Sequence, residues 1–307
     1  MGGAAAALAG YAADRALGDP ARFHPVAAFG AIAAAFESRL WRPSRPAGAA
    51  YTALLVGGTW TATAALRRAL RAHGGATLLL DAAVVWTTLG GRSLERAAGA
   101  LAAAVEAGDL ERARALAPTL VGRDPRELGP DQLCRAAVES VAENTADAVL
   151  APLLWFVFGG APAAAAYRAA NTLDAMVGHR NDRHLRFGWT AARLDDLLNW
   201  PVARVGAALS LALAPSVGGS RRRAWRTLRR DGGSHPSPNA GWMEAAFAGA
   251  LDVRLGGVNR YGTRLERRPV LGSGAAPAPE DVRRAIRLAR VVSHTGALLA
   301  VAASARR

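Results

Sequence analysis

Residues 148–167 read AVLAPLLWFVFGGAPAAAAY, an uncharged run long enough to cross a lipid bilayer. Pro152, Pro162 and the Gly159–Gly160 pair interrupt this run, and both residue types oppose a continuous helix. A broken helix is tolerated at membrane depth only where protein or water satisfies the freed backbone groups. The run therefore predicts an all-α membrane protein in which this segment either crosses or is re-entrant.

An acidic stripe precedes the run, in the stretch RAAVESVAENTAD (135–147). On a helix, Glu139, Glu143 and Asp147 stack on one face because each lies four residues after the last. Like charges in a row repel, so a cation is expected beside them. A divalent metal fits, since Asn144 adds a neutral oxygen of the kind Mg²⁺ accepts. A solvated helix face with Arg135 as ion-pair partner explains the same pattern.

A second polar stretch follows the run, RAANTLDAMVGHRNDRHLRFGWTAARLDDLLNW (168–200). Its Asn-Thr-Leu-Asp (171–174) repeats the Asn-Thr-Ala-Asp of residues 144–147. At helical spacing Arg168 shares a broad face with Asn171 and Asp174, and Asp195–Asp196 precedes the next apolar segment. Polar groups at both ends of a membrane-length segment are costly to bury, which makes them candidates for a functional site.

Composition points to a membrane protein rather than a nucleic-acid binder. The chain has 307 residues, 51% of them hydrophobic, with a formal charge of +14, and a mean hydropathy of +0.10. Apolar and basic residues are segregated along the chain instead of mixing basic with aromatic residues on one face. There is no lysine and only one cysteine, Cys134. A Walker-A loop, a lysine Schiff base, an internal disulfide and a cysteine metal cluster are thereby excluded.

Further segments complete a single polytopic domain, residues 1–307, with about five to six membrane-embedded helices. Besides 148–167, the expected membrane segments are residues 1–17, 49–66, 74–90, 197–218 and 288–302. Residues 92–134 are predicted to form a peripheral segment of amphipathic helices at the membrane face. Residues 219–287 are expected to be a polar loop region. The segment 1–17 lacks a basic start and is not interpreted as a cleaved signal.

Two loops contain histidines among turn-forming residues. In DGGSHPSPNAG (231–241), glycine backbone followed by a helix start could cradle an anion, with Ser234, His235, Ser237 and Asn239 beside it. An ordinary loop with a capped helix explains the same residues. His24, before Pro25, is by itself more typical of a structural histidine.

Five long stretches, in this order, resemble the CobD/CbiB family of cobalamin-biosynthesis membrane proteins. They are GDPARFHPV (18–26), GDLERARALAPTLVGRDP (108–125), AVESVAENTADAVLAPLLW (137–155), YRAANTLDAMVGHRNDRHLRFGWTAARLDDLLNWPVAR (167–204) and DGGSHPSPNAGWMEAAFAGALDVRLGG (231–257). The resemblance implies an adenosylcobinamide-phosphate synthase, an acid–amine ligase of the inner membrane with its active site facing the cytoplasm. Such an enzyme uses ATP and Mg²⁺ to join adenosylcobyric acid, a corrinoid, to aminopropanol phosphate or a related amino alcohol.

This reaction assigns tasks by residue type. A carboxylate is a poor acyl donor, so ATP must convert it to an acyl phosphate or an adenylate, and the transferred phosphoryl group needs cationic stabilisation. We expect Mg²⁺ ligands among Glu139, Glu143, Asn144, Asp147, Asp174, Asp195 and Asp196. We expect substrate and phosphate contacts from Arg168, Asn171, Arg180, Arg183, Arg193, Ser234, Ser237 and Asn239. The expected catalytic residues are His24, His235, Glu143 and Asp174, with the two histidines deprotonating the attacking amine.

Two other classes of protein remain open. A membrane prenyltransferase also holds Mg-diphosphate with Asn/Asp clusters at helix ends, and a non-catalytic carrier could hand corrinoid between enzymes. Expected partners are the small-molecule substrates, the lipid bilayer, and a second copy of the chain or other corrinoid-pathway enzymes, but no nucleic acid. If 148–167 returns instead of crossing, the two Asn-Thr-x-Asp motifs meet on one side of the membrane.

Overall fold

The computed structural model describes residues 2–20, 24–121, 124–261 and 264–306, with the side chains of 259–266 left undescribed. Residues 21–23 and 122–123, which fall within two of the matching stretches, lie outside the described residues. The chain divides into two compact units. The first comprises Met1–Gly90, Asp147–Asn199 and Gly296–Arg307, and the second Gly91–Ala146 and Trp200–Thr295.

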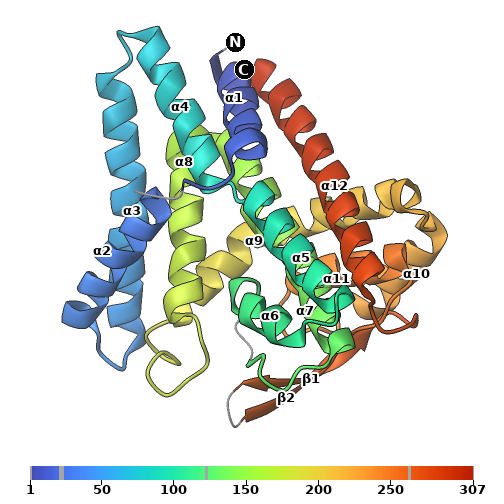
Figure 1. The fold of residues 1–307 in the computed structure, drawn as a ribbon. Coiled ribbons are helices and arrows are strands. Elements are labelled where there is room, and N and C mark those ends of the chain that lie inside the picture. Colours follow the sequence, from blue (N-terminus) through green and yellow to red (C-terminus); the bar gives the residue numbers. More distant parts are fainter. Residues whose placement is uncertain (1, 21–23, 122–123, 262–263, 307) are drawn as a thin grey trace. The chain divides into compact units, whose positions relative to one another are not determined.

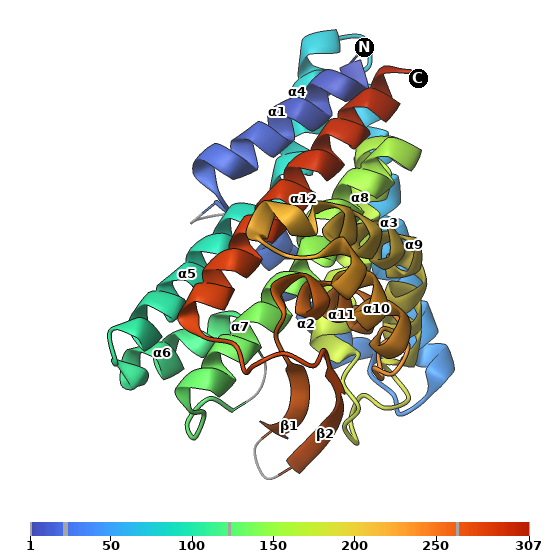
Figure 2. The same cartoon turned by 90° about the vertical axis from the view of Figure 1, so that its right-hand side faces the viewer.

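The first unit is entirely helical in its described residues (Figure 1). It contains α1 (Gly2–Leu17), α2 (Pro25–Leu40), α3 (Arg45–Ala69), α4 (Gly74–Thr88), a π-turn (Ala146–Leu150), α8 (Ala151–Val177), the start of α9 (Trp189–Leu213) and the end of α12 (Pro279–Ala305). α1 packs along α4 (Figure 2), and α8 packs against α2, α3 and α4. α8 is therefore the central helix of this unit.

α8 is broken where the sequence predicts it. Gly159 and Gly160 have non-helical backbone angles, and Gly160 has φ +67° and ψ −162°, a region that is essentially restricted to glycine. Beyond the break the chain reverses, since the Tyr167 hydroxyl lies 3.0 Å from the carbonyl oxygen of Asp147. A straight helix would separate residues 20 positions apart by about 30 Å. The predicted break is confirmed, and the segment is a helical hairpin.

Two apolar clusters hold the hairpin in place. One joins the two halves of α8 through Leu153, Phe156 and Ala164 to Tyr11 of α1 and Val85 of α4. The other packs Leu173 and Val177 of α8 against Tyr51 of α3, Phe187 and Ala191, all buried. The small side chains of the alanines in this segment, such as Ala161 and Ala164, allow this close packing.

The second unit contains helices and one β-hairpin. Its elements are α5 (Gly91–Glu106), α6 (Leu110–Leu116), a 3-10 turn (Ala117–Thr119), α7 (Pro130–Thr145), the rest of α9, a 3-10 turn (Ala214–Val217), α10 (Arg221–Asp231), α11 (Ala240–Leu251), antiparallel strands β1 (Leu255–Tyr261) and β2 (Arg264–Leu271), and most of α12. α7 packs against α5 and α11, and α10 packs against α11. The region 219–287, expected to be a polar loop region with a helix beginning near Gly241, holds α10, α11, the β-hairpin and the start of α12.

Asp231 fastens the end of α10 in this unit. Its carboxylate accepts hydrogen bonds from the Arg230 guanidinium at 2.7 Å and from the Gly272 amide at 2.8 Å. Burial raises the pKa of this carboxyl, but the two hydrogen bonds outweigh burial and hold the pKa below its usual value. The ionised form is therefore favoured in the folded state.

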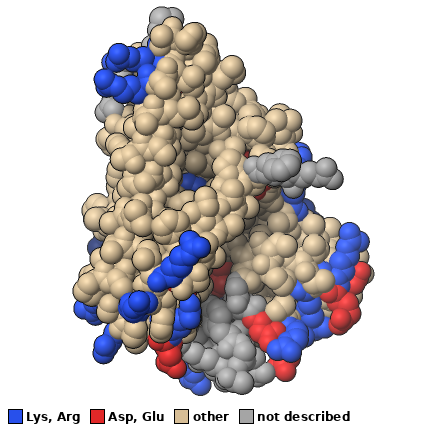
Figure 3. All heavy atoms as spheres, turned by 90° about the vertical axis from the view of Figure 1, so that its left-hand side faces the viewer, with Lys and Arg blue, Asp and Glu red and all other residues tan. Residues whose placement is uncertain are grey.

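Three helical stretches within the described residues are long and apolar enough to cross a membrane: Pro130–Val177, Trp189–Val217 and Pro279–Ala305. The expected count of five to six is not confirmed, because α1 and α4 have only 16 and 15 residues and the 25 residues of α3 are rich in Ala, Gly and Thr. The α2–α3 face is nonetheless largely uncharged between basic groups near its ends (Figure 3). Leu54, Trp60 and Leu66 are exposed on α3, as is typical of a surface that contacts lipid.

Candidate functional site

A chain of hydrogen bonds joins α8 and α9 in the first unit. The Asp195 carboxylate accepts from both neighbouring amides, with Asn171 Nδ2 at 3.1 Å and Asn199 Nδ2 at 3.0 Å. Arg168 donates in turn to Asn171 Oδ1 at 3.2 Å. Both amides are oriented by these contacts, since each presents its NH₂ to the carboxylate. The predicted residues Arg168, Asn171 and Asp195 are thus brought together.

Tyr167 extends this network to the other end of the hairpin. Its hydroxyl lies 2.8 Å from Asn199 Oδ1 and 3.0 Å from the Asp147 carbonyl oxygen. Tyr167 and Asn199 are each only 1% exposed. The carboxylates of Asp147 and Asp195 and the Arg168 guanidinium all act electrostatically on the hydroxyl. We define the six residues Asp147, Tyr167, Arg168, Asn171, Asp195 and Asn199 as the α8–α9 network.

Sequence reasoning missed Tyr167 and Asn199. Asn199 follows Asp195 by four residues, so helical spacing placed the two on one face and could have identified it. Tyr167 carried no such signal, because a tyrosine at the end of an apolar run is normally core packing. Only the reversal at Gly159–Gly160 places it against Asp147.

A pocket of about 330 Å³ lies beside the network in the first unit. Arg168 is the only charged residue among those that line it. The remaining walls are apolar or threonine side chains: Pro25, Val26, Phe29, Thr59, Thr63, Leu80, Ala83, Val84, Thr87, Thr88, Ala165, Ala169 and Thr172. The Arg168 Nε atom is buried with no hydrogen-bond partner among the described residues. A buried, unsatisfied guanidinium nitrogen beside a pocket is suited to an anionic ligand.

Other predicted residues of the first unit lie outside the network. Asp196 pairs with Arg193 at 3.2 Å, and Arg180 acts on the same carboxylate. Arg183 pairs with Glu37 at 2.9 Å. These contacts place the arginines on the connection between α8 and α9 and at the start of α9. Their acidic partners are Glu37 and Asp196, not Asp195.

Asp174 and His24 have local structural contacts. The Asp174 carboxylate lies over Gly178, where any β-carbon would overlap it. His24 caps α2, since its Nδ1 accepts a hydrogen bond from the Val26 amide at 3.1 Å. A nitrogen that accepts is unprotonated, so the neutral imidazole carries its proton on Nε2. This contact makes His24 the cap of α2.

The predicted residues Glu139, Glu143 and Asn144 belong to the second unit. The Glu139 carboxylate accepts from the Gly256 amide at 2.8 Å and lies 3.7 Å from the Arg135 guanidinium. Arg135 also donates to the Gly256 carbonyl. Asn144 donates to the Ser140 carbonyl at 3.0 Å. Glu139 and Arg135 thus fasten the β-hairpin to α7.

The Ser234–Asn239 loop is also in the second unit and is held by its own side chains. His235 Nδ1 accepts from the Ser237 amide at 3.1 Å, and Ser237 Oγ accepts from the Ala240 amide at 3.1 Å. Arg204 donates to Asn239 Oδ1 at 2.9 Å and is stacked on Trp200 and Trp242. Ser234 Oγ donates to the Asp231 carbonyl. These contacts are typical of an ordinary loop that leads into a helix, with Ser237 accepting from the first amide of α11.

The donor set of the network suits Mg²⁺ without forming a complete cage. Within the part of the chain that the structure describes, no three His, Cys, Asp or Glu side chains gather as a metal site. Mg²⁺ is commonly bound by one or two carboxylates together with water and substrate phosphates. Asp147 and Asp195 provide two carboxylates near Tyr167. The expected seven-residue metal set stays a prediction.

Comparisons with known proteins agree with this arrangement of motifs. Residues 7–289 match the family described as CobD/Cbib protein. The "Cobalamin biosynthesis protein CobD" of Mycobacterium tuberculosis is 52% identical over 294 residues, covering 96% of this chain and 93% of that protein. The protein of the same name from Geobacter metallireducens is 45% identical, over 86% of this chain and 85% of that protein. The one from Chromobacterium violaceum is 42% identical, over 95% of this chain and 93% of that protein. No solved structure matches the chain. The chain therefore belongs to the CobD/CbiB family of cobalamin-biosynthesis proteins.

Proposed function

We propose that this protein is an amide-forming ligase of cobalamin biosynthesis. It joins a propionate carboxyl of adenosylcobyric acid to the amine of aminopropanol phosphate, or of a related amino alcohol, and yields adenosylcobinamide phosphate. Family membership supports the pathway. The α8–α9 network supports the chemistry, because it combines carboxylates, amides and an arginine beside a pocket.

The observation that carries the proposal is the position of Arg168. Arg168 lines the 330 Å³ pocket, its guanidinium donates to Asn171 Oδ1, and its buried Nε has no hydrogen-bond partner among the described residues. That volume suits a small phosphorylated amine rather than a corrinoid. A guanidinium binds phosphate through paired N–H donors, which orients the amine at the other end of the substrate.

A carboxylate is a better candidate than a histidine for receiving the proton of the amine. The Nδ1 atoms of His24 and His235 both accept backbone hydrogen bonds. Asp147 lies at the start of the hairpin and Asp195 on α9, and both carboxylates act electrostatically on Tyr167. Tyr167 and the two asparagines fix the geometry of Asp195, as a general base or a ligand requires.

ATP and Mg²⁺ are part of this proposal. Bound Mg²⁺ would neutralise charge on the transferred phosphoryl group, and Asp147 and Asp195 are the side chains that would hold it. The three apolar helices indicate a membrane protein. We propose the inner membrane, with the site open to the cytoplasm, where the nucleotide is available.

The test compares two carboxylates of the first unit, one inside the network and one outside it. Purified protein in detergent receives ATP, Mg²⁺, adenosylcobyric acid and aminopropanol phosphate, and the amide product is measured by mass spectrometry. We expect product only when all components are present, and a loss of about a hundredfold or more in Asp195→Asn. The matched control is Asp182→Asn, an exposed carboxylate of the same unit, on the connection between α8 and α9 and outside the network. Equal activities in the two variants would show that the network is not the site, and no amide product from wild type would overturn the function.

A further inference from the structure

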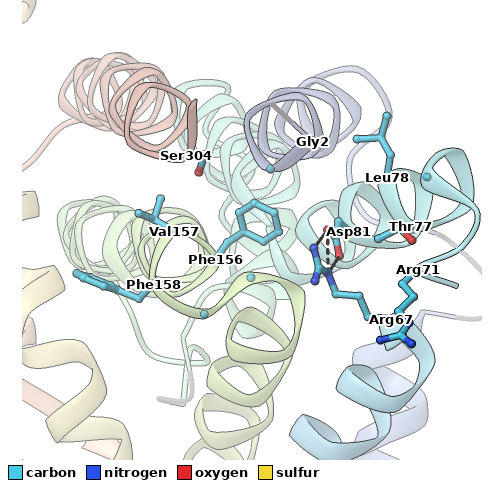
Figure 4. A pocket seen from close by; sticks show the side chains of 14 residues that line it. Gly2, Arg67, Arg71, Thr77, Leu78, Asp81, Phe156, Val157, Phe158 and Ser304 are labelled. Carbon is cyan, nitrogen blue, oxygen red and sulfur yellow. Dashed lines mark hydrogen bonds and ion pairs between the residues drawn. The ribbon is translucent and has the colours of Figure 1, made fainter. Parts of the chain in front are cut away.

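A second pocket, of about 620 Å³, lies in the first unit away from the α8–α9 network. The start of α1, the connection from α3 to α4, the break in α8 and the end of α12 surround it (Figure 4). It shares no lining residue with the pocket beside Arg168. Its lining consists of Gly2, Gly3, Arg67, Arg71, Gly74, Thr77, Leu78, Asp81, Phe156, Val157, Phe158, Gly159, Gly160 and Ser304.

The charged side chains of this pocket leave an excess of positive charge. Asp81, 4% exposed, is its one acidic lining residue and is held by Arg67, with Nε–Oδ1 2.9 Å and Nη2–Oδ2 3.1 Å. This pair neutralises Asp81. The Arg71 side chain is exposed and makes no hydrogen bond or ion pair to another described residue. Its guanidinium is therefore available to an anion, and Figure 4 shows it at the side of the pocket near Arg67.

Backbone amide groups add to the positive electrostatic potential of the pocket. α1 begins at Gly2 and α4 at Gly74, and both glycines line the pocket. The first amides of a helix lack partners within the helix and carry partial positive charge. Among the described residues, no side chain caps α4, whose preceding residue is His73. The amide donors reinforce the attraction that the arginines exert on an anion.

The opposite wall of the pocket is apolar. It consists of Phe156, Val157 and Phe158 on the first half of α8 (Figure 4). Phe158 remains 58% exposed. Ser304 lies one residue before the end of the apolar stretch Pro279–Ala305, which is the depth at which lipid headgroups meet hydrocarbon. A soluble anion has no apolar surface to bury against this wall, whereas a lipid has an acyl chain.

We propose that this pocket binds one anionic phospholipid, with its phosphate at Arg71 and Arg67 and the start of an acyl chain along Phe156 and Phe158. The charge selects an acidic headgroup over a zwitterionic one. The bound lipid closes the space between the ends of α1, α4 and α12 and the tip of the α8 hairpin.

The experiment measures lipid retention by native mass spectrometry of the full chain purified from mixed phosphatidylglycerol and phosphatidylcholine. We expect one phosphatidylglycerol to be retained preferentially and Arg71→Gln to weaken its retention about fivefold, the usual effect of one arginine at an anionic membrane surface. The matched control is Arg68→Gln, an exposed arginine at the end of α3, three residues before Arg71, that does not line the pocket. It should retain lipid as the wild type does.

Two results would overturn the proposal. Equal losses in Arg71→Gln and Arg68→Gln would show general surface charge rather than a site. Displacement of the lipid by millimolar inorganic phosphate would show that the pocket takes a soluble anion. Thermal unfolding of each variant in detergent checks that both are folded, so a difference between them reports on the pocket.

Discussion

Replacing Tyr167 by Phe removes one oxygen atom and tests whether the α8–α9 network is the active site. The hydroxyl lies 2.8 Å from Asn199 Oδ1 and 3.0 Å from the Asp147 carbonyl, in a position 1% exposed. It has one proton to donate, so the substitution removes one donated hydrogen bond and leaves a buried acceptor without it. The expected loss of stability is about 1–3 kcal/mol. Asn199, which orients Asp195, loses its fixed position.

The matched control is Tyr51→Phe. Tyr51 is fully buried in the same unit and donates to the Ala33 carbonyl at 3.1 Å, away from the network. Both variants should lose similar stability in thermal unfolding. Only Tyr167→Phe should lose turnover, by about tenfold to a hundredfold, because small misplacements of reacting groups cost this much. The loss should appear in kcat more than in KM for the amino alcohol phosphate. Equal turnover in the two variants would refute the reasoning.

Further substitutions test the hairpin, an acid-sensitive contact and the topology. Gly160→Ala should destabilise the protein by about 1–3 kcal/mol, because the backbone angles of Gly160 are unfavourable for any residue with a side chain. Gly57→Ala in α3 should not, because an added β-carbon there meets open space. Thermal unfolding of the two variants measures the difference. The pKa of Asp231 is lowered in the folded protein. Its contribution to stability is therefore complete above about pH 4, the usual carboxyl pKa, and is lost as the pH falls further. The unfolding temperature of Asp231→Asn should fall less steeply with acid than that of the wild type, and an equal fall would contradict this. If the second half of α8 spans the membrane, Arg71 and Asp182 lie on opposite sides of it. Single cysteines at these two positions, with the native cysteine replaced, should then react with an impermeant thiol reagent from opposite sides of oriented vesicles. Labelling of both from the same side would contradict the crossing.

The break in α8 was predictable from sequence because Gly-Gly-Ala-Pro acts locally. Backbone freedom and the missing proline N–H belong to the residues themselves, and no tertiary contact is needed to recognise them. The pairing of Asn171 with Asp195 was only partly predictable. Their residue types marked both as candidates, but the contact depends on how two helices pack, and sequence periodicity does not specify that.

The acidic stripe shows the opposite case. Periodicity placed Glu139, Glu143 and Asp147 on one helix face, and a metal and an arginine partner explained the pattern equally well. For Glu139 the structure shows the arginine partner and a strand amide, a contact with Gly256 more than a hundred residues away. Pairing across such a distance leaves no local signal. The π-turn from Ala146 to Leu150 also changes the helical spacing at Asp147, which a 3.6-residue pattern does not anticipate.

The hairpin explains why a polar network can exist inside so apolar a segment. A straight crossing would place Asp147 and Asn171 more than 30 Å apart, since 24 residues of helix rise about 36 Å. The reversal at Gly159–Gly160 returns the chain, and Tyr167 then bridges Asp147 to Asn199. The buried Tyr167 hydroxyl gains an acceptor that a single crossing could not supply, and an unpaired buried hydroxyl would cost about 1–3 kcal/mol. The two glycines therefore do more than interrupt a helix, because the assembly of the α8–α9 network depends on the turn they form.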